Sequence, residues 1–402
     1  MVKRHAGVDW GSQRHAVCVV EQDGSICLEL LVQHDSVGTD ELVRELKVAG
    51  VHSVAIERPD GVVVALLVQA GFEVVPVHPN VVKAARMRYR CHGGKSDPSD
   101  AYVLADVLRT DGHRLTPLRP QSDEICALRA LVQGRDDLVR SKVRAANQLR
   151  ELLQSYWPGA ADVFSDVDTL IALSFIQHYP TPQSASRLGP TRMAAFCKRH
   201  GYSGRRTPQE LLQRLRAAAS VELGPLETQA KGQVALALAR LLASLVEQIR
   251  LATKELGQFV ATCADGPILM SFPAAGQVRA AQILAELGSC RERFASVEHL
   301  AAQAGIVPVT YASGKKKAVT FRWACNHRLR AALTGLADGS RHVNAWAADM
   351  YARARQRGCD HAHATRILAR AWLRVIWRAW QDRQPYDPER HGAAVRLSAA
   401  GG

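Results

Sequence analysis

The sequence predicts an α/β domain with a mixed β-sheet, followed by a mainly helical remainder. Short apolar runs rich in Val, Ile and Leu alternate with helical patterns over residues 5–80. This order favours a sheet with helices packed on it. Two long stretches with apolar residues at helical spacing follow, over 121–155 and 226–262. With 402 residues, the chain is long enough for two or three domains.

The predicted sheet begins with a strand that ends in Asp9, followed by two β-rich runs around the Asp-Gly pair at 23–24. Asp-Gly between such runs is a strong hairpin signal. The stretch "TDELVRELKVAG" predicts a helix whose cap is Thr39 or Asp40. A strand ending at Glu57, a buried helix ("GVVVALLVQAG") and a further strand ("FEVVPVHP") complete the pattern of a mixed sheet.

The two long helical stretches are expected to pair as an antiparallel coiled coil. The segment between them, 157–225, is richer in Pro, Gly and Ser and is expected to form a small helical insert. After Pro267 the pattern runs through a turn into a helix, then to a second helix and a hairpin-like segment. The expected domains are a sheet domain over 1–118, the coiled coil with its insert over 119–262, and a C-terminal domain over 263–402.

The chain is strongly basic, with a formal net charge of +14, which predicts a polyanionic partner such as nucleic acid. Most of the excess lies from Tyr311 onward, where 17 Lys and Arg face 6 Asp and Glu. Arginines recur every four residues in the last helical pattern and predict a stripe that contacts phosphates. These arginines are Arg366, Arg370, Arg374 and Arg378. The alternative for this stripe is the solvated face of a core helix.

Several protein classes find no support in the sequence. The first residues lead straight into a strand pattern, not a signal peptide, and no apolar run reaches the length of a membrane span. The nine cysteines include no C-x-x-C pair. Neither a disulfide framework nor a zinc ribbon is therefore expected.

The stretch "GKSDPSDA" (94–101) allows three interpretations. A phosphate-binding loop would need glycine where the chain has Tyr89, so this interpretation fails. A helix start is physically sound, with Asp97 as N-cap, Pro98 as first helical residue and Asp100 near the positive end of the helix dipole. The third interpretation, a metal site, depends on further carboxylates.

Asp9 and Glu57 supply those carboxylates, because each ends a predicted strand. If the two strands are neighbours in the sheet, the two side chains are adjacent. A helix packed across the sheet could bring Asp97 and Asp100 to the same point. Four carboxylates so close repel one another unless cations neutralise them, and Mg²⁺, with its preference for oxygen ligands, suits phosphoryl transfer. The sequence thus predicts one acidic, Mg²⁺-binding cluster.

This D-E-D-D set resembles, in order and spacing, the RuvC-like branch of the RNase H fold. Three C-terminal segments, "SFPAAGQVRAAQILAELG", "HLAAQAGIVPVTYASGKKK" and "NHRLRAALTGLA", look like the domain of the DEDD insertion-sequence transposases of the IS-one-ten group. These are bridge-RNA-guided serine recombinases, and the resemblance covers nearly the whole chain. It implies that Asp9, Glu57, Asp97 and Asp100 bind metal and that Ser313 is the nucleophile.

Two segments depart from the pattern of that group. Pro273–Gly276 reads Pro-Ala-Ala-Gly instead of Pro-Gly-x-Gly, which weakens the expectation of a DNA contact there, and "CNHRLR" replaces Gly-Asn before Arg-Leu-Arg. Next to Ser313, Gly314 allows close approach of a DNA backbone. The neighbouring cations are expected to bind the scissile phosphate. They are Lys315, Lys316, Lys317 and Arg322. The alternative for this segment is a solvated basic turn.

The resemblance implies a DNA transposase or recombinase that cuts and rejoins DNA through a phosphoserine intermediate, with Mg²⁺ as cofactor. It also implies donor DNA, target DNA and a bridge RNA as partners, and a dimer or tetramer in which the acidic site of one subunit meets the serine of another. A RuvC-like endonuclease that hydrolyses DNA is the alternative, since it needs only the four acids; a non-catalytic nucleic-acid-binding protein is a third possibility. The expected location is the bacterial cytoplasm, at the nucleoid, with no membrane partner.

Overall fold

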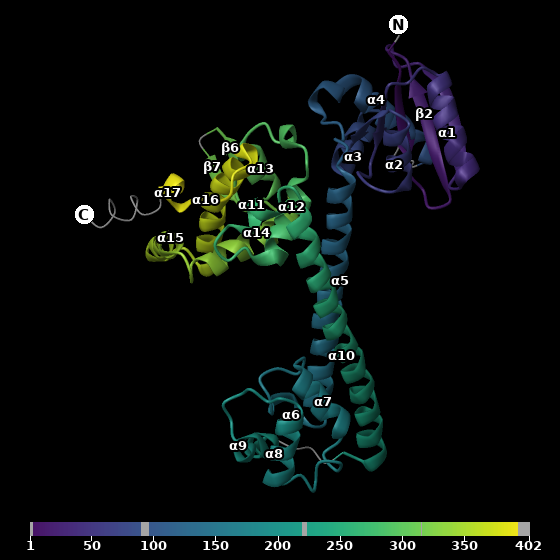
Figure 1. The fold of residues 1–402 in the computed structure, drawn as a ribbon. Helices are drawn as coiled ribbons and strands as arrows, with labels where there is room; N and C mark the ends of the chain where they lie inside the picture. Colours follow the sequence, from purple (N-terminus) through teal and green to yellow (C-terminus); the bar gives the residue numbers. More distant parts are fainter. Residues whose placement is uncertain (1–2, 90–95, 219–222, 315, 393–402) are drawn as a thin grey trace. The chain divides into compact units, whose positions relative to one another are not determined.

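The computed structural model describes residues 3–89, 96–218, 223–314 and 316–392. The chain divides into two compact units, Met1–Pro120 and Gln121–Gly402. Figure 1 labels many of their helices and some of their strands. The first unit contains a five-stranded sheet, and the second is mainly helical with a two-stranded sheet.

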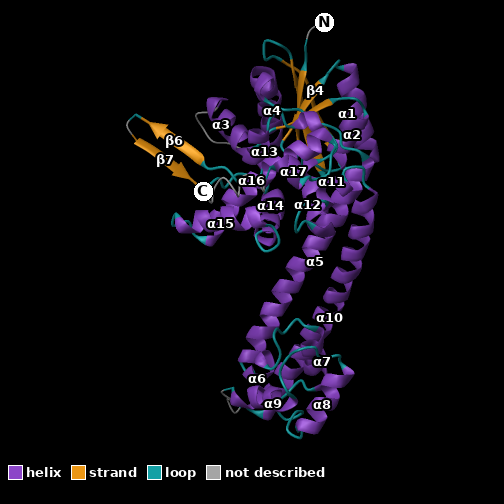
Figure 2. Cartoon of the chain, turned by 60° about the vertical axis from the view of Figure 1, so that its left-hand side comes forward, coloured by secondary structure: helices purple, strands orange, loops and turns teal. Residues whose placement is uncertain are grey.

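The sheet of the first unit has the strand order β3-β2-β1-β4-β5, and Figure 2 shows its strands in orange. The strands are β1 (His5–Asp9), β2 (Arg14–Val20), β3 (Ile26–Gln33), β4 (Ser53–Ile56) and β5 (Glu73–Pro76). β2 is antiparallel to β1 and β3, whereas β1, β4 and β5 are parallel. The predicted mixed sheet is confirmed, as is the hairpin at 23–24, where Gly24 has φ 93°.

Helices cover both faces of this sheet. They are α1 (Ser36–Val48), α2 (Val62–Gln69), α3 (Pro79–Tyr89) and α4 (Asp97–Asp111), followed by the short η1 (Gly112–Arg114). On one face, Leu46 of α1 and Leu67 of α2 share a buried core with Ile56. On the other face, Ala101 of α4 packs with Cys18, and α3 lies beside α4. This arrangement places the start of α4 over the sheet.

α4 crosses β1 at Gly7. A β-carbon on Gly7 would lie 2.1 Å from the carbonyl oxygen of Ala101 and 2.5 Å from the backbone nitrogen of Ala105. Only glycine therefore lets the helix backbone approach the strand so closely. The contact fixes the position of α4 along β1, two residues before the end of that strand at Asp9.

α1 begins earlier than predicted. The sequence predicts Thr39 or Asp40 as the cap, but the helix starts at Ser36. Asp35 has extended backbone angles, and its carboxylate accepts a hydrogen bond from the Gly38 N–H at 2.8 Å. An aspartate in this position satisfies one of the free N–H groups of the first turn, so it starts the helix one turn earlier.

Two long helices dominate the second unit: α5 (Asp123–Gln154) and α10 (Pro225–Thr262). Near one end of the pair, Arg135 Nε donates to Thr253 Oγ1 at 2.9 Å. Near the other end, Lys231 Nζ donates to the Ser155 carbonyl at 3.4 Å. Contacts in this order require the helices to run antiparallel, which confirms the predicted pairing.

The predicted helical insert lies between these two helices in sequence. It consists of α6 (Pro158–Asp162), α7 (Leu170–His178), α8 (Pro190–Arg199) and α9 (Pro208–Ala217). Phe175 and Leu211 lie in its core together with Leu149 of α5 and Leu242 of α10. The insert therefore packs on the paired helices through a core that it shares with them.

The C-terminal part of the second unit surrounds a separate core that includes Trp372 and Trp380, both fully buried. Its elements are α11 (Gly266–Met270), α12 (Gly276–Leu287), η2 (Arg291–Arg293), α13 (Val297–Gln303), β6 (Val309–Ser313), β7 (Lys316–Thr320), α14 (His327–Ser340), α15 (Ala345–Gln356), α16 (His361–Asp382) and α17 (Pro388–His391). β6 and β7 form the predicted hairpin. Within the described ranges, no helix has both the length and the apolar character needed to cross a membrane.

Candidate functional site

Two of the predicted acids lie together at the carboxyl edge of the sheet. β1 and β4 are parallel neighbours whose last paired residues are Val8 and Ile56. Asp9 and Glu57 each follow those residues by one, so they take equivalent positions on adjacent strands, and both are partly exposed. Adjacent strands lie about 4.8 Å apart. The sheet therefore holds the backbones of these two residues at neighbouring positions.

The first turn of α4 lies toward the same edge. The last turn of α4 reaches the opposite edge, because Arg109 donates to the Gln22 carbonyl in the β2–β3 turn at 3.1 Å. That turn adjoins the amino end of β1. α4 thus runs antiparallel to β1, and its first turn, which carries Asp97 and Asp100, points toward the edge that ends in Asp9. We call these two aspartates, with Asp9 and Glu57, the acidic edge.

The cap of α4 differs by one residue from the prediction. Ser96, not Asp97, has the extended backbone of an N-cap, and its carbonyl accepts from the Asp100 N–H at 3.0 Å. Asp97 is therefore the first helical residue and Pro98 the second. The correction leaves both aspartates in the first turn, where the helix dipole favours negative charge.

Asp100 is the most buried member of the acidic edge, with its side chain 4% exposed. Arg86 of α3 lies against it: Nη2 is 2.7 Å and Nε 2.8 Å from Asp100 Oδ1. A charged carboxylate without a partner would be costly in such a place. Asp97, in contrast, is exposed. The two aspartates share a helical turn but differ in environment, because Asp100 lies buried against Arg86 of α3 and Asp97 is exposed.

The chemistry of the acidic edge fits a hard divalent cation, because all four side chains offer carboxylate oxygens. Among the residues that the structure describes, however, no three His, Cys, Asp or Glu side chains are gathered closely enough to hold an ion. At Asp100 the positive charge comes from Arg86. The metal-binding role of the acidic edge stays a prediction.

Two histidines lie next to the Asp9 end of the acidic edge. His15 of β2 is fully buried and precedes Ala16, the residue paired with Asp9. The Gly11 N–H donates to His15 Nδ1 at 3.3 Å, and His15 Nε2 is 2.9 Å from His34 Nδ1. Burial lowers the pKa of His15, and the neighbouring His34 lowers this pKa further. A neutral His15 therefore ties the turn after Asp9 to β2.

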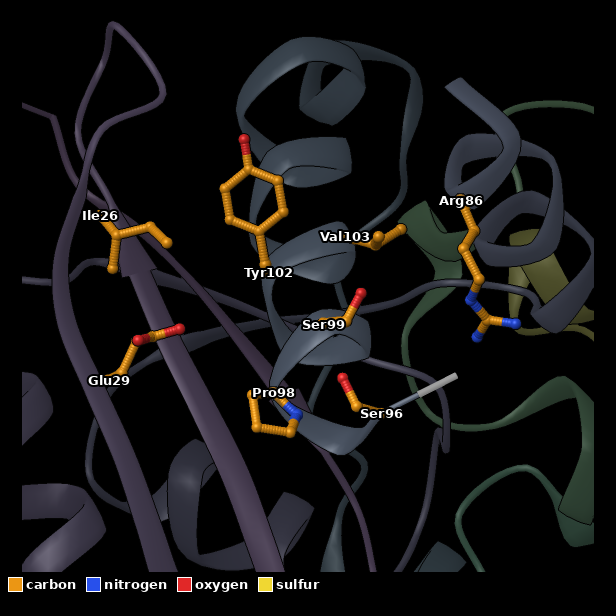
Figure 3. A pocket seen from close by; sticks show the side chains of 8 residues that line it. All are labelled: Ile26, Glu29, Arg86, Ser96, Pro98, Ser99, Tyr102 and Val103. Carbon is orange, nitrogen blue, oxygen red and sulfur yellow. The ribbon is translucent and has the colours of Figure 1, made fainter. Parts of the chain in front are cut away.

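A hollow of about 360 Å³ lies beside the start of α4. In Figure 3, Ser96, Pro98 and Ser99 extend from the helix, with Arg86 on one side and Glu29 of β3 on the other. No member of the acidic edge lines the hollow. It is therefore a neighbour of the predicted metal site and not that site itself.

The predicted nucleophile lies at the end of an exposed hairpin, β6–β7, which we call the serine hairpin. Ser313 is the last residue of β6 and pairs with Lys316, and Gly314 has φ 55°. Ser313 is exposed, and among the described residues no histidine or carboxylate hydrogen-bonds to its hydroxyl. Lys317 is exposed on β7. Lys315 and the side chain of Lys316 lie outside the described residues.

The predicted phosphate contacts on α16 differ in exposure. Arg374 and Arg378 are exposed, whereas Arg366 and Arg370 are partly buried. Trp372, Leu373 and Trp380 of the same helix are buried. Arg322, which precedes α14, is also partly buried, and its Nε has no hydrogen-bond partner among the residues that the structure describes. The arginine stripe is thus only half solvated.

The Pro-Ala-Ala-Gly turn keeps a glycine-like backbone despite its alanines. Ala274 has φ 61° and Gly276 has φ 53°, both in the left-handed region. An alanine there costs about 1–2 kcal/mol relative to an ordinary helical backbone, whereas glycine adopts it freely. The chain therefore keeps a turn suited to Pro-Gly-x-Gly, and the departure in sequence does not remove it.

Sequence reasoning missed three residues that shape these regions. Gly7 carries a usable signal, because an isolated glycine inside a strand indicates close approach of another backbone. Arg86 carries no such signal in the sequence, because nothing in the basic run "KAARMRYR" distinguishes it from Arg88. Trp323 follows the serine hairpin and is 75% exposed, a property visible only in the structure.

Two family models match the chain. A DEDD-type IS110 transposase model matches residues 6–158, which include the whole acidic edge. A model described as "Transposase IS116/IS110/IS902 family" matches residues 266–352, which include Ser313. The two matches therefore cover both regions that carry the predicted chemistry.

Full-length relatives agree with these matches. The chain is 33% identical over 410 residues to the "Mini-circle putative transposase for IS117" of Streptomyces coelicolor, covering 98% of each chain. It is 30% identical to the "Insertion element IS900 uncharacterized 42 kDa protein" of Mycobacterium paratuberculosis, covering 97% of this chain and 98% of the relative. It is 27% identical to the "Insertion element IS116 uncharacterized 44.8 kDa protein" of Streptomyces clavuligerus, covering 95% and 96%. The chain belongs to the IS110/IS116 family of transposases, and it is an enzyme that rearranges DNA.

Proposed function

We propose that this transposase cuts and rejoins DNA through a phosphoserine intermediate formed by Ser313, with Mg²⁺ bound at the acidic edge. The observation that carries the proposal is the exposed position of Ser313 at the end of the serine hairpin. Gly314 beside it has φ 55°, and apart from its chain neighbours no atom of the described residues lies within 4 Å of a β-carbon position there. This end of the hairpin therefore has room for a DNA backbone.

In the proposed reaction, Ser313 Oγ forms a bond to the phosphorus of a DNA phosphodiester. The bond from that phosphorus to one deoxyribose oxygen breaks, and the leaving oxygen takes up a proton. The serine proton passes to an acceptor in the assembled site or to water. Because the phosphodiester is kept as a serine ester, a new deoxyribose hydroxyl can reverse the step and rejoin the strand without an external energy source.

The groups near Ser313 suit a polyanionic substrate. Lys317 is exposed on the neighbouring strand, and the arginine stripe of α16 belongs to the same unit. The same quarter of the chain holds 17 Lys and Arg against 6 Asp and Glu. Cations placed there stabilise the charge that develops on a phosphate under attack.

The acidic edge is proposed to hold the metal, because DEDD-type transposases generally use a divalent cation. When bound, Mg²⁺ would neutralise the four carboxylates and polarise phosphate oxygens. The chain's own part is to hold Asp9 and Glu57 at adjacent strand ends. Arg86 balances the charge of Asp100 when no other cation does so.

The strand order and the helices on both faces of the sheet support a RuvC-like, RNase H-type domain for residues 1–118. We also propose a bridge RNA that pairs with donor and target DNA, and a dimer or tetramer in which the acidic edge of one subunit serves the serine of another. The net charge of +14 supports a nucleic-acid partner beyond one short DNA segment. Adding RNA transcribed from the DNA flanking the gene should convert non-specific cutting into cutting at matching sites.

Hydrolytic cutting at the acidic edge is the competing mechanism, and one experiment separates the two. Purified wild type should form a DNA adduct that resists denaturation, and Ser313→Ala should lose at least about 10³-fold in cutting and all of the adduct. Thr310→Val, which removes an exposed hydroxyl from the same strand, should behave as wild type. A Ser313→Ala protein that still cuts DNA at the wild-type rate would overturn the serine mechanism in favour of hydrolysis.

A further inference from the structure

The side chain of Trp323 is largely exposed to solvent, so it contributes little to the packing of the protein core. Its side chain is 75% exposed, whereas Trp372 and Trp380 of the same unit are fully buried. A tryptophan carries a large apolar surface, and leaving it in water forgoes the stabilisation that its burial would bring. A single exposed apolar side chain is common on protein surfaces, so the surroundings of Trp323 decide whether it marks a binding surface.

The surroundings of Trp323 are aromatic and cationic. Its ring meets Phe321 edge to face, with centroids 4.9 Å apart and an interplanar angle of 80°. The guanidinium carbons of Arg330 and Arg366 lie 4.4 Å and 4.9 Å from the centroid of Phe321. These arginines come from α14 and α16, so two helices bring their cations to one aromatic residue after β7.

Carboxylates form no ion pair with these two cations in the described part of the chain, although Arg366 interacts electrostatically with Asp360. Arg330 donates to the carbonyl of Arg322, and neither Arg330 nor Arg366 has an ion-pair partner among the described residues. Asp338 lines the same cavity, but its carboxylate is paired with Arg341 Nε at 2.7 Å. A positive potential therefore remains beside Phe321.

These side chains border a cavity of about 440 Å³ between α14 and α16. Phe321, Arg330 and Arg366 line it, and the hydroxyl of Thr334 and the ring of His361 add polar groups. A cavity of this size, with a few polar groups on an apolar wall, falls within the range of small-ligand sites. Gly305 leaves room for the Arg330 side chain, because a β-carbon on Gly305 would lie 2.2 Å from Arg330 Nη2.

We propose that Trp323, Phe321, Arg330 and Arg366 form a binding site for one unpaired nucleotide of a DNA strand. The base stacks on the open face of Trp323, and the phosphate lies against the two guanidinium groups. Aromatic rings and arginines bind unpaired bases in this way, whereas bases inside a duplex are already stacked on their neighbours. The site is thus selective for DNA that is locally unpaired.

The position of the site relative to Ser313 gives it a use, and in this respect it rests on the proposed function. β7 leads from the turn after Ser313 directly to Phe321, and a five-residue strand spans about 16 Å. A strand bound along the hairpin would place an unpaired nucleotide several nucleotides from the phosphate under attack. Holding that nucleotide out of the duplex keeps a strand end available for exchange.

The test measures binding of DNA duplexes that contain a single bulged 2-aminopurine, whose fluorescence falls when the base stacks on an aromatic ring. All proteins carry Ser313→Ala as background, so that covalent chemistry contributes nothing to the signal. We expect tighter binding and stronger quenching with the bulged duplex than with the fully paired one. Adding Trp323→Ala should weaken binding of the bulged duplex roughly 5- to 150-fold and abolish the quenching, with little change for the paired duplex.

Three further variants keep the test decisive. Trp323→Phe preserves an aromatic face and should keep most of the preference for the bulge, even if the alanine variant folds poorly. Arg366→Gln should weaken binding and reduce its salt dependence by about one phosphate contact. Arg357→Gln, an exposed arginine at the end of α15, should change neither preference nor quenching.

Three results would overturn the proposal. The first is equal binding of bulged and paired duplexes by the background protein. The second is unchanged quenching in the Trp323→Ala variant. The third is tighter, Trp323-dependent binding of the same bulge in RNA, which would reassign the site to RNA. Because none of these readouts involves bond breakage, they stay separate from success or failure of the Ser313 mechanism.

Discussion

The acidic edge and the serine hairpin are built in opposite ways. Asp9 and Glu57 are fixed by the register of two parallel strands, and Asp100 is buried against Arg86. The serine hairpin is exposed along β6 from Thr310 to Ser313. An isolated two-stranded hairpin is only marginally stable in water. The comparison teaches that the fold itself positions the acids, whereas few buried contacts hold the serine.

This difference makes mutational behaviour predictable. Substitutions of the buried residues that hold the acidic edge in place should change both the stability of the first unit and the activity of the protein. Substitution of Ser313 on the serine hairpin should change activity without changing stability, because this exposed side chain contributes little buried surface.

The largest effect expected in the first unit comes from Asp97→Asn, which should reduce adduct formation and DNA cutting about 10²- to 10³-fold. Asp97 is exposed, so thermal unfolding should stay close to wild type. Asp111→Asn, on the same helix with its side chain 37% exposed, is the matched control and should keep full activity. If both variants cut DNA equally well, Asp97 has no role in the chemistry.

Gly7→Ala should destabilise the protein by about 2–4 kcal/mol, because its β-carbon would meet the backbone of α4. Urea unfolding measures this change, and residual activity should fall with it, since α4 carries Asp97 and Asp100. Gly112→Ala is the control, because its β-carbon would meet only the flexible end of Leu108 at 3.4 Å. Equal stability of the two variants would contradict the proposed role of Gly7 in placing α4.

A smaller, pH-dependent effect is expected from His15. Its pKa is lowered in the folded protein by burial and by His34, from an ordinary value of 6.5. Below that pH the unfolded chain takes up the proton more readily, so the stabilisation by neutral His15 is present above pH 6.5 and is lost as the pH falls through its folded pKa. The melting-temperature gap between wild type and His15→Gln should therefore shrink from pH 8 to pH 5. A gap that widens on acidification would show that His15 is charged when folded.

The smallest effect is expected at the turn before α12. Ala274→Gly should stabilise the protein by up to about 1 kcal/mol, because glycine adopts φ 61° without strain. Ala275→Gly, at a position with an ordinary φ of −64°, should destabilise it instead. Chemical denaturation of the two variants checks the sign, and a loss of stability in Ala274→Gly would disprove strain at this turn.

Much of the first unit was predictable, because strand ends and turn residues carry local signals. The neighbouring positions of Asp9 and Glu57 follow from alternating strands and helices. The predicted N-cap of α4 was wrong by one residue, because Ser and Asp are both good caps and the local sequence does not indicate which of the two is used. Arg86 could not be predicted, because its contact with Asp100 depends on how α3 packs beside α4. The exposure of Trp323 likewise depends on tertiary packing and not on its sequence neighbours.

The most direct test asks whether the two regions serve one reaction. The measurement is the amount of DNA-linked peptide containing Ser313, identified by mass spectrometry after proteolysis of reactions run with Mg²⁺ or with a chelator. The account predicts that the linked peptide forms with Mg²⁺, falls to background with chelator, and is nearly absent for Asp97→Asn under either condition. Formation of the Ser313-linked peptide at the same rate with chelator would contradict it, because the serine would then act without the acidic edge.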